Sequence, residues 1–211
     1  MEGIGLSKAH RPRTRGQKVV AAFVATGAII AITATMVPKS AQAHSFSLAL
    51  VSGETSGPER LEAAIRGVLL ASDERDGHSD ETSDGHLGGL DVYLSVFPAP
   101  AAGSIAGLKN VAQSGFDIAI ELEPGAIGAT FAPDPRAVVI GPGTSDGVPQ
   151  AAMARFARAF QSAYGVAPDS AARAGYNAAR RIDLAVRALG GVGDRAALTR
   201  ALAASEAGLD W

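Results

Sequence analysis

The fold of this chain is decided by residues 156–203, which read FARAFQSAYGVAPDSAARAGYNAARRIDLAVRALGGVGDRAALTRALA. Starting just before this stretch, large side chains recur at three- and four-residue spacing, the period of a helix with one buried face: Met153, Phe156, Phe160 and Tyr164. Gly165 suits a left-handed helix end, and Pro168 prevents the helix from continuing. The pattern therefore predicts a helix that ends near Tyr164.

Two further helices follow in the same stretch. Asp169 or Ser170 can cap the first of them. Its predicted buried face consists of small and apolar side chains at helical spacing: Ala179, Ile182, Val186 and Leu189. Gly190 ends this helix, and Asp194 can cap a last helix whose inward residues are Leu198 and Leu202. Such stripes are typical of packed helices and by themselves indicate no chemistry.

The chain before this stretch alternates between strand and helix patterns. Short apolar segments predict four strands: 46–51, 90–97, 116–122 and 137–140. Helical patterns lie between them, one beginning at Pro58 and one around 105–111. This alternation predicts a mostly parallel sheet with helices on both faces. We expect the strand order 2-1-3-4, with all three C-terminal helices packed on the sheet. Any ligand crevice would then be lined by the loops that follow the strands: 52–57, 98–103, 123–126 and 141–147.

Three parts of the sequence resemble the type I periplasmic binding proteins, the branched-chain amino-acid receptor branch of ABC transport. They are the YG-x-x-P break at residues 164–168, the Gly-Tyr-Asn-Ala-Ala cluster at 175–179, and the opening strand, glycine-rich loop and helix at 48–77. The resemblance implies a three-layer, flavodoxin-like α/β fold. Members of the family carry a second lobe before the closing helices, where this chain has only residues 141–149. The resemblance therefore implies one lobe, spanning residues 44–211.

The N-terminus has the layout of an export signal. Its basic region, Arg11, Arg13, Arg15 and Lys18, precedes an apolar run at 19–37 and the small-residue site Ala41-Gln42-Ala43. Cleavage there would release a periplasmic or otherwise exported chain that begins at His44. The alternative is an uncleaved membrane anchor, because the apolar run is about long enough to span a bilayer.

Composition excludes several classes of function. The whole chain carries a net charge of −2, and residues 1–43 contain six Lys/Arg and one Glu, so residues 44–211 carry −7. An acidic domain is a poor binder of nucleic acid. The chain has no Cys, which excludes disulfides, Cys–zinc sites and thiol catalysis. It also lacks the G-x-x-x-x-G-K-[ST] loop that cradles nucleotide phosphates.

The loop after the last predicted strand reads Gly-Thr-Ser-Asp-Gly at 143–147, which matches the G-x-S-x-G of a hydrolase nucleophile elbow. A hydrolase serine needs a His that normally comes later in the chain, whereas the four His all come earlier, at 10, 44, 78 and 86. We therefore expect no enzyme activity. Such small polar residues are also typical of a turn with no ligand.

The resemblance implies a different role for this loop, which is to hold a ligand carboxylate through hydroxyls and backbone N–H groups. Thr144 and Ser145 would supply the hydroxyls, together with Ser52 and Thr55 from the first loop. Glu121 and Glu123 depart from the family, because a carboxylate at the end of the third strand favours a cation or amine. They are equally typical of a solvated strand end.

Residues 80–91 fit the register of a calcium loop, with oxygen ligands at Asp80, Thr82, Asp84 and Asp91. The last position lacks the usual bidentate Glu, and a predicted strand follows in place of a helix. His78 and His86 could instead hold zinc with nearby carboxylates. We expect a solvated acidic loop, with no tight metal site and no cofactor.

The sequence as a whole predicts an exported, non-enzymatic, substrate-binding-protein-like chain linked to ABC-type uptake. Its small ligand would be amino-acid-like or a carboxylate. One lobe leaves such a ligand open on one side, so binding would be weak or would need a partner: a second copy, an ABC permease or another periplasmic protein. The alternatives are an adaptor or structural module that kept the fold but lost small-molecule binding, and a remnant without selected function.

Overall fold

A five-stranded sheet forms the centre of the computed structural model, which describes residues 44–53, 55–75, 82–98, 115–124, 126 and 137–205. The strands lie in the order β2-β3-β1-β4-β5. Their bounds are β1 Ser45–Val51, β2 His86–Leu87, β3 Leu90–Phe97, β4 Ile118–Glu121 and β5 Val138–Ile140. The pairs β3–β1, β1–β4 and β4–β5 are parallel. The expected α/β class and the order 2-1-3-4 of the four predicted strands are thus confirmed.

One strand is not expected from the sequence. β2 pairs antiparallel with β3 and forms the edge of the sheet, within the segment expected to be an acidic loop. A tight turn connects the two strands through Gly88 and Gly89, whose φ angles of +68° and +82° are strained for other residues. With only two residues, β2 has too little sequence to show the alternation that identifies a strand.

Four helices accompany the sheet in the described part of the chain: α1 Pro58–Asp73, α3 Gln150–Tyr164, α4 Ser170–Leu189 and α5 Arg195–Ala204. The caps are as expected. Asp169 accepts a hydrogen bond from the Ala172 amide at 2.7 Å, and Asp194 accepts one from the Ala197 amide at 2.9 Å. Gly165 ends α3 with a φ of +74°. Among these helices, none combines the length and apolarity needed to cross a membrane.

The main core lies on one face of the sheet. Alternate β1 residues, Phe46, Leu48 and Leu50, join the apolar sides of α1, α4 and α5 there. The expected inward residues of the last two helices are buried except Leu189, which is 40% exposed because it lies in the last turn of α4, beyond the core. A smaller cluster of Ala49, Val51 and Ala119 occupies the opposite face. The helix predicted around 105–111 lies outside the described residues.

Glycine allows α1 and α4 to pack against each other at close range. A Cβ atom on Gly67 would lie 2.1 Å from the carbonyl oxygen of Ala172, and one on Gly175 would lie 2.1 Å from that of Ala64. Neither position can accept a side chain without a shift of the helix backbone. This reciprocal contact gives a physical reason for the glycine that begins the 175–179 cluster.

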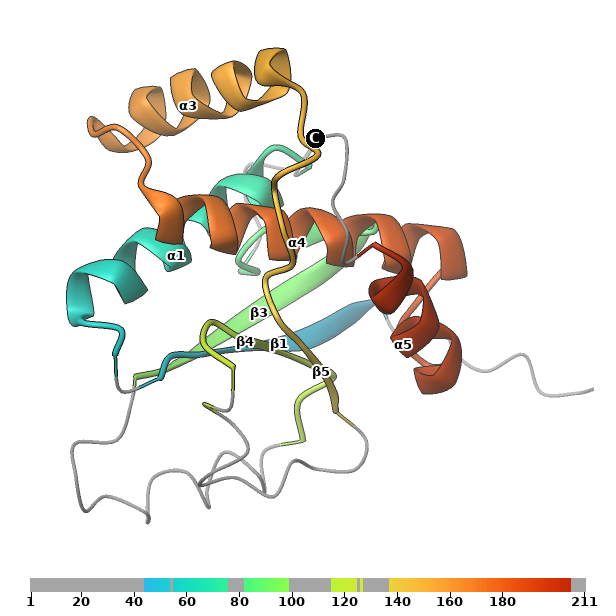
Figure 1. The fold of residues 1–211 in the computed structure, drawn as a ribbon. Helices are drawn as coiled ribbons and strands as arrows, with labels where there is room; N and C mark the ends of the chain where they lie inside the picture. The colour runs from blue at the N-terminus through green and yellow to red at the C-terminus, as the bar shows by residue number, and fades with distance from the viewer. Residues whose placement is uncertain are drawn as a thin grey trace, which may run out of the picture. The chain divides into compact units, whose positions relative to one another are not determined.

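The position of α3 differs from the expectation that all three C-terminal helices pack on the sheet. Figure 1 shows α3 against the helix layer, on the side away from the strands. Its apolar stripe meets aromatic rather than strand residues, with the rings of Phe156 and Tyr176 centred 4.6 Å apart. The Arg66 guanidinium of α1 lies over the Tyr164 ring, 5.6 Å from its centre. Because α1 and α4 already cover this face of the sheet, the third apolar stripe packs on those helices.

Candidate functional site

The loop at 141–147, which follows β5, is held in place by two buried side chains of α4. The Asn177 amide nitrogen donates to the carbonyl oxygens of Pro142 at 2.7 Å and Thr144 at 3.3 Å. The Arg181 guanidinium donates to the Gly141 carbonyl at 2.6 Å. Both side chains are almost fully buried, at 1% and 2% exposed. Loop carbonyls that would otherwise need water are therefore satisfied from the helix.

Arg181 also connects this loop to α5. Its other nitrogens donate to the carbonyl oxygen of Leu202 at 2.7 Å and to the Ser205 hydroxyl at 3.2 Å. Gly143 fits over the guanidinium, because a Cβ there would lie 2.8 Å from Nη1, and the φ of +71° at this position also favours glycine. The loop is thus fixed by tertiary contacts and by its own turn geometry.

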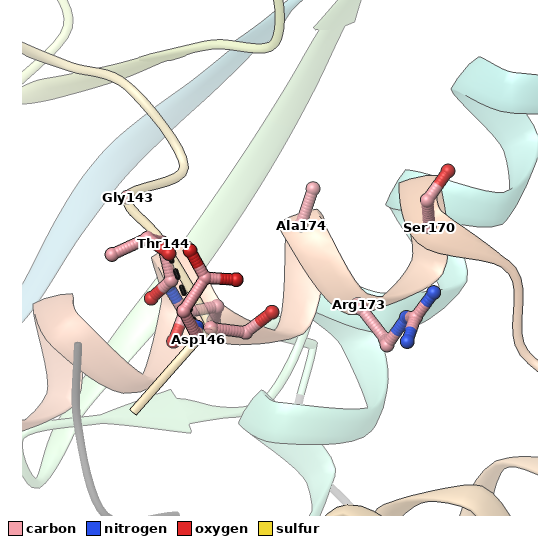
Figure 2. A pocket seen from close by; sticks show the side chains of 8 residues that line it. Gly143, Thr144, Asp146, Ser170, Arg173 and Ala174 are labelled. Atoms are coloured by element: carbon pink, nitrogen blue, oxygen red, sulfur yellow. Dashed lines mark hydrogen bonds between the residues drawn. The ribbon is translucent and has the colours of Figure 1, made fainter. Parts of the chain in front are cut away.

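A pocket of about 420 Å³ lies between this loop and the first turns of α4 (Figure 2). Figure 2 shows Thr144 and Asp146 of the loop opposite the α4 turns that carry Ser170, Arg173 and Ala174. The full lining is Gly143, Thr144, Ser145, Asp146, Ser170, Arg173, Ala174 and Asn177. Asp146 and Ser170 are exposed, so solvent reaches the pocket. Its size lies within the range of small-molecule sites.

The pocket combines hydroxyl groups with one charge of each sign. Thr144 accepts a hydrogen bond from the Asp146 amide at 3.1 Å, which closes a turn and leaves the hydroxyl proton available for donation. Arg173 can pair with a carboxylate, and Asp146 can accept from an ammonium group. This arrangement suits a small zwitterion or carboxylate. Among the described residues that line the pocket there is no histidine, so none of them offers Ser145 an imidazole base.

The structure brings together only two of the five predicted ligand residues in this pocket, namely Thr144 and Ser145. Ser52 is 2% exposed, and its backbone amide donates to the Phe97 carbonyl at 3.1 Å, which joins the ends of β1 and β3. Thr55 and Glu123 form a separate cluster with Ser56. None of these residues lines the pocket.

In that cluster, the Glu123 carboxylate lies against the loop that leads into α1. The Thr55 hydroxyl donates to Glu123 at 2.5 Å, the Thr55 amide donates at 3.3 Å, and the Ser56 hydroxyl donates to the second carboxylate oxygen. These bonds, first from Ser56 and then from Thr55, lower the pKa of the Glu123 carboxyl. A Cβ on Gly53 would lie 2.2 Å from the carboxylate, so this approach needs glycine. The expected ligand donor Thr55 therefore donates to a side chain of the protein itself.

Two of the other predicted carboxylates, Asp84 and Asp91, have structural partners. Glu121 ends β4 and pairs in register with Val51. Asp84 accepts from the Leu94 amide at 2.8 Å, and an Asp91 oxygen lies 2.8 Å from Nε2 of His86. Asp80 and His78 fall outside the described residues, while Thr82 lies at the start of a bend. Within the described residues, no three His, Asp or Glu side chains converge as metal ligands would.

Sequence patterns do not identify the pocket residues that α4 contributes. They indicate Ser170 only as a cap, and they predict no role for Arg173, Asn177 or Arg181. A signal is nevertheless present, since several polar residues, among them Asn177, Arg180, Arg181 and Asp183, interrupt the apolar stripe of α4 and are all buried. Buried polar groups need partners, so such interruptions indicate contacts with loops or with one another.

Comparison with known proteins finds a distant structural likeness and no match by sequence. No protein-family model matches the chain, and no curated protein matches it. The crystal structure of a branched chain amino acid ABC transporter periplasmic ligand-binding protein from Burkholderia xenovorans LB400 is similar, with 17% identity and a TM-score of 0.26. The match covers 76% of this chain and 45% of that protein, so the chain spans less than half of its length. Values this low support no functional argument, and a function has to be argued from the pocket and the sequence.

Proposed function

We propose that this chain is an exported, non-enzymatic binding protein whose pocket at 141–147 takes a small amino-acid-like or carboxylate ligand. The observation that carries this proposal is that Arg173 and Asp146, which carry opposite charges, both line a pocket that is also lined by Thr144 and Ser145 with their hydroxyls. A free amino acid carries the complementary charges, a carboxylate and an ammonium group. The family resemblance supports the further proposal of a link to an ABC uptake system in the periplasm.

Affinity should be weak for the isolated chain. Each hydrogen bond to a ligand in a solvated site adds only about 0.5–1.5 kcal/mol, because the same groups bond to water in the free state. After the cost of association, the dissociation constant is expected to be roughly 0.1–1 mM. A second copy, a permease or another periplasmic partner that covers the open side would exclude water and tighten binding.

The test is a thermal-shift screen of the full-length chain with amino acids, small carboxylates and amines, at several protein concentrations, followed by titration calorimetry of any hit. The variants are Thr144→Ala/Ser145→Ala and Arg173→Gln, with Arg200→Gln as the matched control on the exposed side of α5. We expect an amino acid or carboxylate to bind, the double variant to abolish binding, and the control to leave it unchanged.

The competing function is an adaptor that kept the fold without the ligand. The observation in its favour is that Thr55 and Ser56 both donate hydrogen bonds to Glu123 at the ends of β1 and β4. The strand order reverses there, and such sheets usually bind ligands at that point. The absence of any hit at every concentration, together with capture of a defined protein partner, would favour the adaptor over the receptor.

A further inference from the structure

The walls of the pocket at 141–147 are almost entirely polar. Among the described residues that line it, Ala174 alone has an apolar side chain, and that side chain is a single methyl group. The other side chains carry hydroxyl, carboxylate, guanidinium or amide groups: Thr144, Ser145, Asp146, Ser170, Arg173 and Asn177. Val148, which follows the loop and is half-buried, does not line the pocket. The lining therefore includes no wall that would receive an apolar ligand body.

Most of these polar groups are not committed to the fold. Figure 2 shows Ser170 on the first turn of α4, close to Arg173. The N-cap of α4 is Asp169, so the Ser170 hydroxyl is not needed to cap the helix. In the part of the chain that the structure describes, no hydrogen bond engages the Ser145 or Ser170 hydroxyl, and no ion pair engages Arg173 or Asp146. These groups are therefore available to a ligand.

The polarity of the walls decides which ligand bodies are favoured. Burial of apolar surface is favourable only when that surface leaves water for apolar surroundings. Against the hydroxyls of this pocket, an apolar body would displace water without replacing the hydrogen bonds that the water made. A body with its own hydroxyl or amide group replaces them. Sites that bond to a polar group of the ligand discriminate against the analogue that lacks it.

We propose that the pocket at 141–147 selects ligands with a hydrophilic body, namely amino acids or carboxylates whose side chain carries a hydroxyl or an amide, over those with a branched apolar or aromatic side chain. This inference rests on the proposed function, in which Arg173 and Asp146 bind the carboxylate and the ammonium group that all free amino acids share. The side chain of the ligand then lies against the hydroxyls of Ser145 and Ser170. The volume of about 420 Å³ leaves room for it.

Two pairs of amino acids with matched shapes test the proposal: threonine against valine, and asparagine against leucine. All four carry the same carboxylate and ammonium group, so the ratio of dissociation constants within a pair reports on the side chain alone. NMR titration of the isotope-labelled, full-length chain measures weak binding and shows whether the amide signals of 143–147 respond. We expect threonine and asparagine to bind roughly three- to tenfold more tightly than their partners, the equivalent of one net hydrogen bond.

One variant and one matched control assign the preference to this wall. Ser170→Leu removes a hydroxyl and adds an apolar side chain at an exposed lining position. Ser162→Leu makes the same change at an exposed position of α3 that does not line the pocket. We expect Ser170→Leu to bring the dissociation constants of asparagine and leucine to within about twofold of each other. The control should keep the ratio of the unaltered chain.

The outcomes separate this inference from the proposed function. If valine and leucine bind the unaltered chain at least as tightly as threonine and asparagine, the hydrophilic preference is overturned and the proposed amino-acid site stands. If none of the four binds saturably, both are overturned. An asparagine-to-leucine ratio that Ser170→Leu changes no more than Ser162→Leu does would overturn the placement of the ligand side chain against Ser170.

Discussion

The buried side-chain amide of Asn177 donates a hydrogen bond of 2.7 Å to the carbonyl oxygen of Pro142. This bond crosses from the middle of α4 to the loop after β5, and a second bond from the same nitrogen reaches Thr144. The shape of the candidate pocket therefore depends on a residue that also belongs to the helical core. Stability and ligand binding are expected to be coupled at this position.

Asn177→Ala should lower the free energy of unfolding by about 1–3 kcal/mol, because it leaves two partly buried loop carbonyls without their donor. It should also weaken the binding of any ligand at 141–147, because the loop is then no longer held against α4. Urea denaturation measures the first effect, and calorimetry measures the second. Gln161→Ala, on the exposed side of α3, is the control and should change stability by less than about 0.5 kcal/mol. A variant as stable as the control would show that the loop does not depend on this bond.

Gly175→Ala should destabilise the chain by about 1–3 kcal/mol, because the new methyl group would lie 2.1 Å from the Ala64 carbonyl oxygen and force α1 and α4 apart. The control is Gly193→Ala, where nothing lies within 4 Å of the added atom. Denaturant midpoints of the two variants compare the effects directly. If the denaturant midpoint of Gly175→Ala is no lower than that of Gly193→Ala, the result contradicts the close approach of α1 and α4.

Asp183→Asn should cost about 3–5 kcal/mol at neutral pH, because it leaves the buried Arg180 without its countercharge. Burial alone would raise the pKa of Asp183, but the hydrogen bond from the Gly88 amide and the contact with Arg187 outweigh it and lower the pKa. The charged form is thus favoured in the folded state. Its contribution is present above the unfolded pKa of about 3.9 and is lost as pH falls through the lower folded pKa.

The stability difference between the unaltered chain and Asp183→Asn should accordingly narrow as pH falls below about 4. Urea denaturation at a series of pH values measures it. Glu62→Gln, which removes an exposed ion pair with Arg66, should change stability by less than about 0.5 kcal/mol. If the difference in unfolding free energy between the unaltered chain and Asp183→Asn instead widens at low pH, the assigned direction of the Asp183 pKa shift is contradicted.

Glu123→Ala should speed hydrogen exchange at the Thr55 amide, which donates to the Glu123 carboxylate in the folded chain. The lowered pKa of Glu123 means that this protection holds above its unfolded pKa of about 4.3 and fades as pH falls through the folded value. Exchange measured by mass spectrometry on peptides covering 52–57 tests this. Glu59→Ala, on the exposed first turn of α1, is the control. Equal exchange rates of the Thr55 amide in the two variants would contradict the hydrogen bonds between Glu123 and the loop at 52–57.

Export should remove residues 1–43. The basic region, the apolar run at 19–37 and the site Ala41-Gln42-Ala43 predict a mature N-terminus at His44. Mass spectrometry of the protein from its native cell identifies that terminus. Recovery of an intact Met1 terminus in the membrane fraction would show an anchor instead.

Several features of the fold follow from local sequence. Asp169, Asp194 and Gly165 act at helix ends where short-range chemistry favours them, because capping depends on neighbours within a few residues. The apolar strands and the helices between them also predicted the strand order, since right-handed crossovers permit few arrangements. Local patterns could not identify β2, because two residues are too few to show the alternation of a strand. They also could not show that α3 packs on α1 and α4, because this packing depends on which surfaces remain exposed once the sheet is covered.

The sequence by itself determined the α/β class, the helix ends and the choice of Thr144 and Ser145, which lie in one turn after one strand. Only the tertiary structure placed Arg173 and Asn177 beside that turn, 29 and 33 positions further along the chain from Thr144. It also showed that the Thr55 hydroxyl donates a hydrogen bond to Glu123, 68 positions away, and does not line the candidate pocket. Hydrogen bonds and charge pairs act over a few ångströms in space, and only the packing of α4 against the sheet brings such distant residues within that range.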